Sequence, residues 1–60
     1  MKYNKDGSVT FEVGDQVGDT TTGSERFGQV KAVNGEVLVI ESNQSASVTW
    51  EVEEKLCYPD

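Results

Sequence analysis

The chain has little of what usually holds a small domain together or carries chemistry. Its 60 residues include no histidine and one cysteine, Cys57, so an internal disulfide is impossible and a structural zinc site is not expected. No apolar run approaches the roughly 18 residues that a membrane-spanning helix needs. The first residues are polar and lack the apolar segment of a signal peptide, and an unpaired cysteine favours a reducing compartment. We therefore expect a cytoplasmic protein that crosses no membrane.

Positive charge is scarce as well. Five lysines and arginines face eleven aspartates and glutamates, which gives a formal net charge of −6. Proteins bind bare nucleic acid mainly through cations that neutralise phosphates, so this balance disfavours direct nucleic-acid binding and docking on an anionic membrane. Two interpretations of the acidity stay open: a solubilising surface, or a face made for a basic partner.

Short stretches of alternating apolar and polar residues predict an all-β fold. Turn residues recur at short intervals and no segment has sustained helical periodicity, which is typical of a small barrel. We predict one five-stranded barrel domain over residues 9–60, preceded by a flexible N-terminal segment over residues 1–8. The residues predicted for its core are Val9, Phe11, Val13, Val17, Phe27, Val30, Ala32, Val37, Val39, Val48, Trp50, Val52 and Leu56.

Two features interrupt the alternation. The segment Gly18–Arg26 has no large apolar residue and is predicted to be an exposed loop. Gly28 lies inside the next apolar stretch and predicts a bulge or a sharp bend, as barrel corners use.

The clearest local signal is the stretch KAVNGEVLVIE, residues 31–41. Its Asn34-Gly35 pair lies between two apolar runs and predicts a tight hairpin turn in which both residues tolerate a positive φ. The run after the turn is continuously apolar, so both faces of that strand require cover. Because Val37 and Val39 are assigned to the core, Leu38 and Ile40 are expected to be covered by the chain ends or by another molecule.

The motifs occur in the order F-x-V-G-D-x-V, loop, G-x-V, hairpin, V-x-V, loop, V-x-W and L-x-x-P. This order resembles that of the small SH3-like barrels, including the KOW-type modules of transcription and translation factors. The resemblance covers Val9 to Pro59 and implies a five-stranded SH3-like barrel, a fold shared by many unrelated functions. The residues that carry it are Phe11, Val13, Gly14, Asp15, Val17, Gly28, Val30, Val37, Val39, Val48, Trp50 and Leu56.

The pattern TFEVGDQV, followed by a glycine, by ES and by SVTWEVEEKL, is similar to that of the plasmid-borne type II dihydrofolate reductases. That family forms a tetramer of SH3-like barrels around a pore and uses a Val-Gln-Ile-Tyr segment and a lysine. Here the segment is Val48-Thr49-Trp50-Glu51, and the lysine position falls near Asp19. The resemblance therefore implies the fold without the reductase activity.

Glutamates recur around the last three predicted strands. On an alternating strand, outward positions are polar in any case, so a solvated face is one interpretation. The other is a phosphate-like surface that occupies the nucleic-acid site of a basic protein. The candidate partner-binding residues of this acidic face are Glu36, Glu41, Glu51, Glu53 and Glu54.

Aromatic and surplus apolar side chains are a second class of candidates. Trp50 could form a peptide-binding groove with Phe27, Tyr58 and Tyr3, although its alternation with neighbouring valines equally suits a core position. The candidate aromatic or apolar contact residues are Leu38, Ile40, Trp50 and Tyr58.

No residue set supports catalysis, so we expect a protein that is not an enzyme and has no metal or cofactor. A filled small barrel offers no cleft that would perturb paired carboxylates. The segment Gly18–Gly23 lacks the Lys-Ser/Thr that completes a phosphate-binding loop. Cys57 has only Lys55 as a basic neighbour, which does not predict a reactive thiol.

Three hypotheses about function follow. The leading one is a small acidic protein-binding module that engages a basic, nucleic-acid-binding protein. A short, acidic, cysteine-poor chain would suit a phage-encoded or mobile-element regulator acting in the cytoplasm of its host. The alternatives are a structural protein that homo-oligomerises through its sheet, and a KOW-like nucleic-acid-associated module, which requires the cations to gather on one face.

Overall fold

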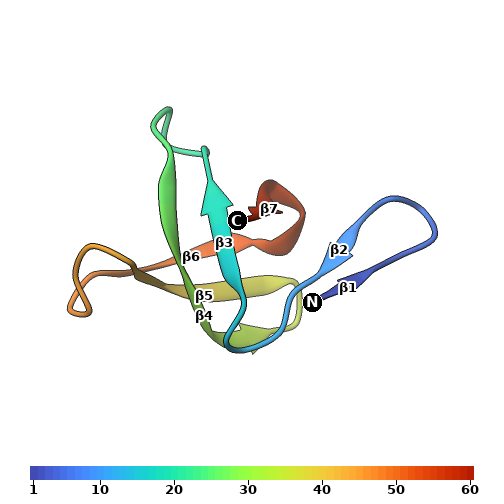
Figure 1. Ribbon diagram of the computed structural model, residues 1–60, viewed down its shortest axis with the longest axis horizontal. Coiled ribbons are helices and arrows are strands. Elements are labelled where there is room, and N and C mark those ends of the chain that lie inside the picture. Colours follow the sequence, from blue (N-terminus) through green and yellow to red (C-terminus); the bar gives the residue numbers. More distant parts are fainter.

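The computed structural model describes all residues from 1 to 60 and shows an all-β chain (Figure 1). A five-stranded sheet forms the body, and a two-stranded hairpin projects from one end. The elements are β1 (Lys2–Tyr3), β2 (Val9–Thr10), β3 (Gln16–Asp19), β4 (Arg26–Asn34), β5 (Val37–Ser42), β6 (Thr49–Glu53), the 3₁₀ turn η1 (Glu54–Leu56) and β7 (Cys57–Pro59).

The five-stranded sheet has the order β6-β5-β4-β3-β7, and every neighbouring pair is antiparallel. Consecutive strands β3 to β6 are therefore neighbours, and η1 carries the chain across so that β7 pairs with β3. In that last pair Val17 lies opposite Pro59, and Asp19 lies opposite Cys57. The predicted all-β class is confirmed, with β6 and β7 as the two edges of the antiparallel sheet.

The predicted hairpin is confirmed, but its turn begins one residue later than expected. Asn34 is the last residue of β4 and pairs with Val37, which leaves Gly35-Glu36 as the two-residue loop. Gly35 has a φ of 63°, whereas no residue other than glycine has a positive φ. A glycine at the first central position is the requirement of a type II′ turn, so Asn34 is free to extend the strand.

A bulge in β4 reverses the prediction of which β5 side chains point into the core. Val30 pairs with Ile40 and Ala32 with Val39, so Lys31 is an extra residue on β4. Opposite residues share a face of the sheet, and Val30 is fully buried; Ile40 and Leu38 therefore point into the core. Assigning Val39 to the core and leaving Leu38 and Ile40 outside it was wrong.

Of the two alternatives predicted for Gly28, the bulge is wrong, and the sharp bend stays a prediction. Gly28 pairs regularly with Val17 and with Ser42. A Cβ atom at this position would collide with the carbonyl of Glu41 and with the side chain of Ile40. The glycine therefore lets β4 and β5 approach closely, and the bulge lies three residues further on, at Lys31.

The core is smaller than the sequence predicted. Three predicted members are exposed: Val13 by 64%, Val48 by 51% and Leu56 by 48%. Val13 lies in the turn before β3, Val48 precedes β6 and Leu56 ends η1, so none of them is on a strand whose alternation would turn it inward. The buried hydrophobic residues are Phe11, Val17, Val30, Leu38, Ile40 and Val52.

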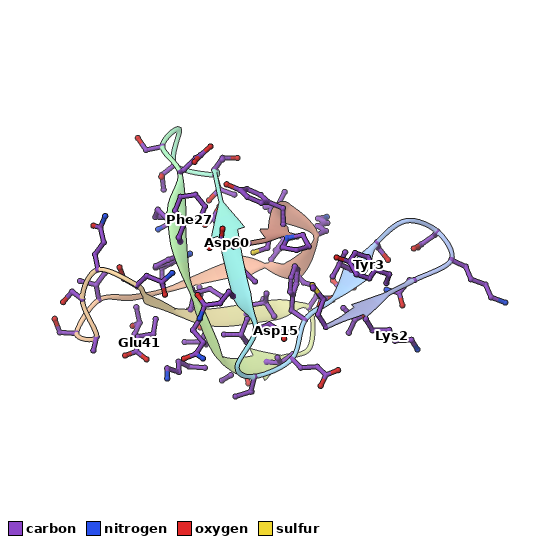
Figure 2. The ribbon with its side chains drawn as sticks, in the orientation of Figure 1. Lys2, Tyr3, Asp15, Phe27, Glu41 and Asp60 are labelled. Carbon is purple, nitrogen blue, oxygen red and sulfur yellow. The ribbon has the colours of Figure 1, made fainter.

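The N-terminal segment forms a hairpin of its own. Lys2 pairs with Thr10 and Tyr3 with Val9, and the side chain of Asn4 donates hydrogen bonds to the hydroxyls of Ser8 and Thr10. Figure 2 shows Lys2 and Tyr3 on this projecting arm, away from the five-stranded sheet. The mobility of residues 1–8 stays a prediction.

Candidate protein-interaction surface

The five-stranded sheet has two faces, and the pairing register decides which glutamates share one. Glu51 lies opposite Val39, and Glu53 lies opposite Val37. Glu41 follows Val39 by two residues, so all of these side chains point to the same side, away from the buried Leu38 and Ile40. We call this side the outer face. It carries three glutamates beside a half-buried strip of valines.

The remaining two candidates lie at one end of the same region. Glu36 is in the β4–β5 turn, and its carbonyl accepts a hydrogen bond of 2.8 Å from the backbone N–H of Glu54. Both residues line a small hollow of about 140 Å³ with Glu53 and Lys55. The structure therefore brings Glu36, Glu53 and Glu54 together at one end of β5, whereas Glu41 lies at the other end of that strand, opposite Thr49.

Glu54 also has a structural partner. Its carboxylate Oε2 accepts a hydrogen bond of 2.9 Å from the backbone N–H of Phe11. This contact ties the segment between β2 and β3 to η1 and helps to place the buried Phe11 ring. Because its carboxylate is already hydrogen-bonded within the chain, Glu54 is the least available of the five candidate glutamates to a partner.

Two of the glutamates are paired within the chain. Lys31 Nζ lies 2.8 Å from Glu41 Oε2, and Lys55 Nζ lies 3.3 Å from Glu53 Oε2. Ion pairs at such exposed positions contribute about 0–1 kcal/mol, so a partner's cations can replace them at little cost. Glu36 and Glu51 form no ion pair in the chain.

The apolar candidates divide between the two faces. Leu38 and Ile40 are fully buried in the core and present no surface to a partner. Trp50 lies opposite Ile40, and therefore also on the inner face, where it is half-buried against the core. Tyr58 lies on the outer face, near the Phe27 side chain.

Trp50 is held by a polar cluster that sequence analysis missed. Its indole Nε1 donates a hydrogen bond of 3.0 Å to Asp19 Oδ2, and the Arg26 guanidinium carbon lies 4.5 Å from the centre of its ring. Arg26 also donates a 2.6 Å hydrogen bond to the same Asp19 oxygen. These contacts fix Trp50 as a structural residue of the inner face.

Asp19 is fully buried, which contradicts its assignment to an exposed loop. Burial desolvates the carboxylate and by itself raises its pKa, but hydrogen bonds from Thr21 and Arg26 and the charge of Arg26 outweigh this and leave the pKa below its usual value. The Thr21 backbone N–H donates to Oδ1 at 2.8 Å. The signal in the sequence was an Asp and an Arg at the two ends of a polar turn, a spacing that many exposed loops share.

An aromatic pair lies on the outer face at the other side of the sheet. Phe27 and Tyr58 flank Gly18 on the neighbouring strands, and their rings meet edge to face with centroids 6.4 Å apart. A Cβ atom on Gly18 would collide with the Tyr58 ring. The glycine therefore lets Tyr58 lie across β3 and contact Phe27.

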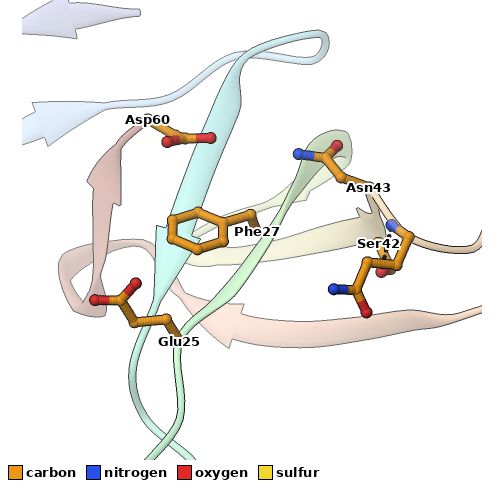
Figure 3. Close-up of a pocket in the computed structure, with 6 residues that line it drawn as sticks. Glu25, Phe27, Ser42, Asn43 and Asp60 are labelled. Atoms are coloured by element: carbon orange, nitrogen blue, oxygen red, sulfur yellow. Dashed lines mark hydrogen bonds between the residues drawn. The ribbon is translucent and has the colours of Figure 1, made fainter.

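Beside this pair lies a shallow cavity of about 390 Å³ (Figure 3). Its position is set by the backbone: the Asn43 N–H donates to the Phe27 carbonyl at 3.0 Å, and the Asp60 N–H donates to the Gln16 carbonyl at 3.2 Å. A second hollow, lined among others by Gln29 and Glu41, shares part of its wall with the first. The residues that line the first cavity are Glu25, Phe27, Ser42, Asn43, Gln44 and Asp60.

Cys57 lies on the inner face opposite Asp19. Burial, followed by the negative charges of Asp19 and Glu54, raises the pKa of its thiol to about 11. The thiol therefore stays protonated at neutral pH, and the protonated form is a poor nucleophile and a poor metal ligand. No group of three or more acidic or cysteine side chains is arranged to hold a metal ion.

Comparison of the chain with known protein families, with curated proteins and with solved structures gives no match. No helix is both long and apolar enough to span a membrane. The chain is a small antiparallel all-β protein, and three glutamates of β5 and β6 lie on one side of its sheet.

Proposed function

We propose that this chain is a small non-enzymatic protein-binding module whose acidic face engages a basic, nucleic-acid-binding protein. The observation that carries the proposal is the register of β5 and β6, which turns Glu41, Glu51 and Glu53 to the same side of the sheet. Glu36 and Glu54 border that side, and the whole chain carries a net charge of −6. A surface of this sign attracts basic partners and speeds their association.

We also propose that the sheet curls into an SH3-like barrel. Along the chain, β3 is the first strand of the five-stranded sheet and β7 is the last, and the two are neighbours. The 3₁₀ turn η1 directly precedes β7. The strand β4 is long and contains a bulge, so it can belong to both halves of a barrel. In Figure 1, β3 and the first part of β4 run steeply across β5 and β6. A barrel would present the outer face of each strand to solvent and to partners.

The distribution of cations favours a basic protein over nucleic acid as the partner. Arg26 is paired with the buried Asp19, and Lys31 and Lys55 are paired with glutamates. Lys2 and Lys5 lie on the separate N-terminal hairpin. This spread does not supply the continuous basic patch that a KOW-like nucleic-acid module needs.

The test is calorimetric titration with a decalysine peptide, which stands in for a basic segment. The double variant Glu51→Gln, Glu53→Gln removes two charges from the acidic face. The matched control, Asp6→Asn, Glu12→Gln, removes two charges from the exposed N-terminal region instead. We expect the first variant to bind roughly tenfold more weakly than the parent chain and the control to bind almost as well, with affinity falling between about 20 mM and 300 mM salt.

Equal losses in the two variants would contradict the proposal, because they would show that net charge alone attracts the peptide. Binding that does not depend on salt would contradict it as well. All four replaced side chains are exposed, and the amides are isosteric with the carboxylates. Because Asp6 Oδ1 accepts two hydrogen bonds from Ser8, urea denaturation first checks that the control folds as stably as the parent chain.

A further inference from the structure

The cavity beside Phe27 lies at the far end of β5 from Glu36, outside the acidic face described above. It is the place on the outer face where an aromatic ring, two carboxylates and several neutral acceptors meet. Figure 3 shows the Phe27 ring between the carboxylates of Asp60 and Glu25, with Asn43 and Ser42 on the opposite wall. These groups come from separate parts of the chain: the β3–β4 loop, β4, the end of β5 and the residue after β7.

The lining carries negative charge without any cation. Glu25 and Asp60 form no ion pair within the chain, whereas Glu41 and Glu53 each have a lysine within 4 Å. The neutral members Ser42, Asn43 and Gln44 add side-chain oxygens that can accept hydrogen bonds. A ligand with several N–H donors and a positive charge matches this lining.

The aromatic ring is held in place. Tyr58 packs edge to face against Phe27 at an interplanar angle of 85°, and the Asn43 N–H binds the Phe27 carbonyl. Burial, followed by the charges of Glu25 and Asp60, raises the pKa of Tyr58. The negative field of the two carboxylates thus extends over the aromatic pair, where it would favour a cation stacked on the ring.

We propose that this cavity takes one arginine side chain of the basic partner, with the guanidinium stacked on Phe27 and donating to the carboxylates of Glu25 and Asp60. Arginine fits better than lysine because its guanidinium is planar, stacks on aromatic rings and presents five donors in a rigid fork. The inference rests on the proposed function for the identity of that partner. The second hollow, which is lined by Glu41 and by its ion-pair partner Lys31, shares three residues with the cavity and connects it to the acidic face. One extended basic segment can reach both if one of its cations replaces Lys31 beside Glu41.

The test is an NMR titration of the ¹⁵N-labelled chain with the capped peptide Gly-Ser-Arg-Ser-Gly, in parallel with the same peptide carrying citrulline, which has the same shape and no charge. We expect the arginine peptide to shift the amide signals of Phe27, Asn43 and Asp60, and the citrulline peptide to leave them unchanged. Phe27→Leu keeps an apolar side chain but removes the ring, and it should weaken binding about two- to fivefold. Glu25→Gln, Asp60→Asn, which changes only exposed groups, should weaken it further.

Equal responses to arginine and citrulline, or an arginine response that survives both variants, would overturn the inference. The variant Glu51→Gln, Glu53→Gln separates it from the proposed function, because it should keep the arginine response while losing decalysine affinity. If decalysine affinity falls as expected and the arginine peptide shifts none of the three amides, the cavity inference fails and the proposed function stands. If the arginine response is as expected and decalysine affinity is unchanged, the acidic-face proposal fails and the cavity remains an arginine site.

Discussion

The two faces of the sheet use carboxylates in opposite ways. On the inner face, Asp19 is fully buried and accepts hydrogen bonds from Thr21, Arg26 and Trp50. On the outer face, Glu51 is exposed and has no partner in the chain. A buried carboxylate without partners would be strongly destabilising, whereas an exposed one is solvated by water. The charge of Asp19 is therefore satisfied within the fold, whereas the charge of Glu51 is left to solvent.

The largest expected loss of stability comes from β5, whose inward and outward side chains were predicted the wrong way round. Ile40→Ala should lower the free energy of unfolding by about 2–5 kcal/mol, because it leaves a cavity in a small core. Val39→Ala on the outer face should cost less than about 1.5 kcal/mol, because Val39 is only half-buried. Urea denaturation of both variants measures the two values. Equal losses would contradict the register in which Val30 opposes Ile40.

A smaller effect is expected for the buried ion pair. Asp19→Asn should lower the free energy of unfolding by about 1–3 kcal/mol, because it weakens hydrogen bonds to a charged acceptor. Glu51→Gln, the matched change on the outer face, should have an effect within about 0.5 kcal/mol. A destabilisation by Glu51→Gln as large as that by Asp19→Asn would remove the contrast between the faces.

The Asp19–Arg26 pair also predicts how the stability of the fold changes at acidic pH. The pKa of Asp19 is lowered on folding, so its contribution is fully present above its unfolded pKa of about 3.8 and is lost as pH falls through the lower folded value. Urea denaturation at pH 7 and at about pH 3 should therefore show a larger acid loss in the parent chain than in Asp19→Asn. An equal loss in both would show that other carboxyls, such as Asp6 and Asp15, account for the acid sensitivity.

A further contrast with the exposed outer face concerns the reactivity of Cys57 on the inner face. With a thiol pKa raised from 9.0 to about 11, its thiolate population at pH 8 is about a hundredfold below that of a free thiol. Alkylation by iodoacetamide should be slower than in the urea-unfolded chain by about that factor. Because folding raises this pKa, the thiol's contribution to stability is present below pH 9 and is lost as pH rises toward 11. Equal alkylation rates in the folded and unfolded chains would contradict the buried position of Cys57.

Local signals in the sequence predicted much of the sheet. Alternation located the strands around Phe27 and Trp50, and the glycine at position 35 located the hairpin, because both signals depend on backbone geometry over a few residues. The bulge at Lys31 could not be predicted, since it depends on which facing of β5 fills the core better. Strict alternation after Val30 placed Ala32 and Val39 inside, and one extra residue reversed this.

The sequence identified the glutamates of the acidic face but could not predict how they are arranged in space. Glutamates at alternating positions 51 and 53 were expected to share a face, whereas the adjacency of Glu36 and Glu54 depends on a contact between the hairpin turn and η1. The cavity beside Phe27 was not predictable. It combines residues that are far apart in the chain, such as Glu25 and Asp60, and they meet only because β7 pairs with β3.

Binding of a basic partner to the outer face around β5 and β6 can be tested by mapping where a polycationic peptide contacts the chain. We propose an NMR titration of the ¹⁵N-labelled chain with decalysine at low salt. We expect the largest shifts at the amides of Val39, Glu51 and Glu53, with little change on the hairpin around Tyr3. Shifts centred on that hairpin, or spread evenly over the surface, would contradict binding at the outer face.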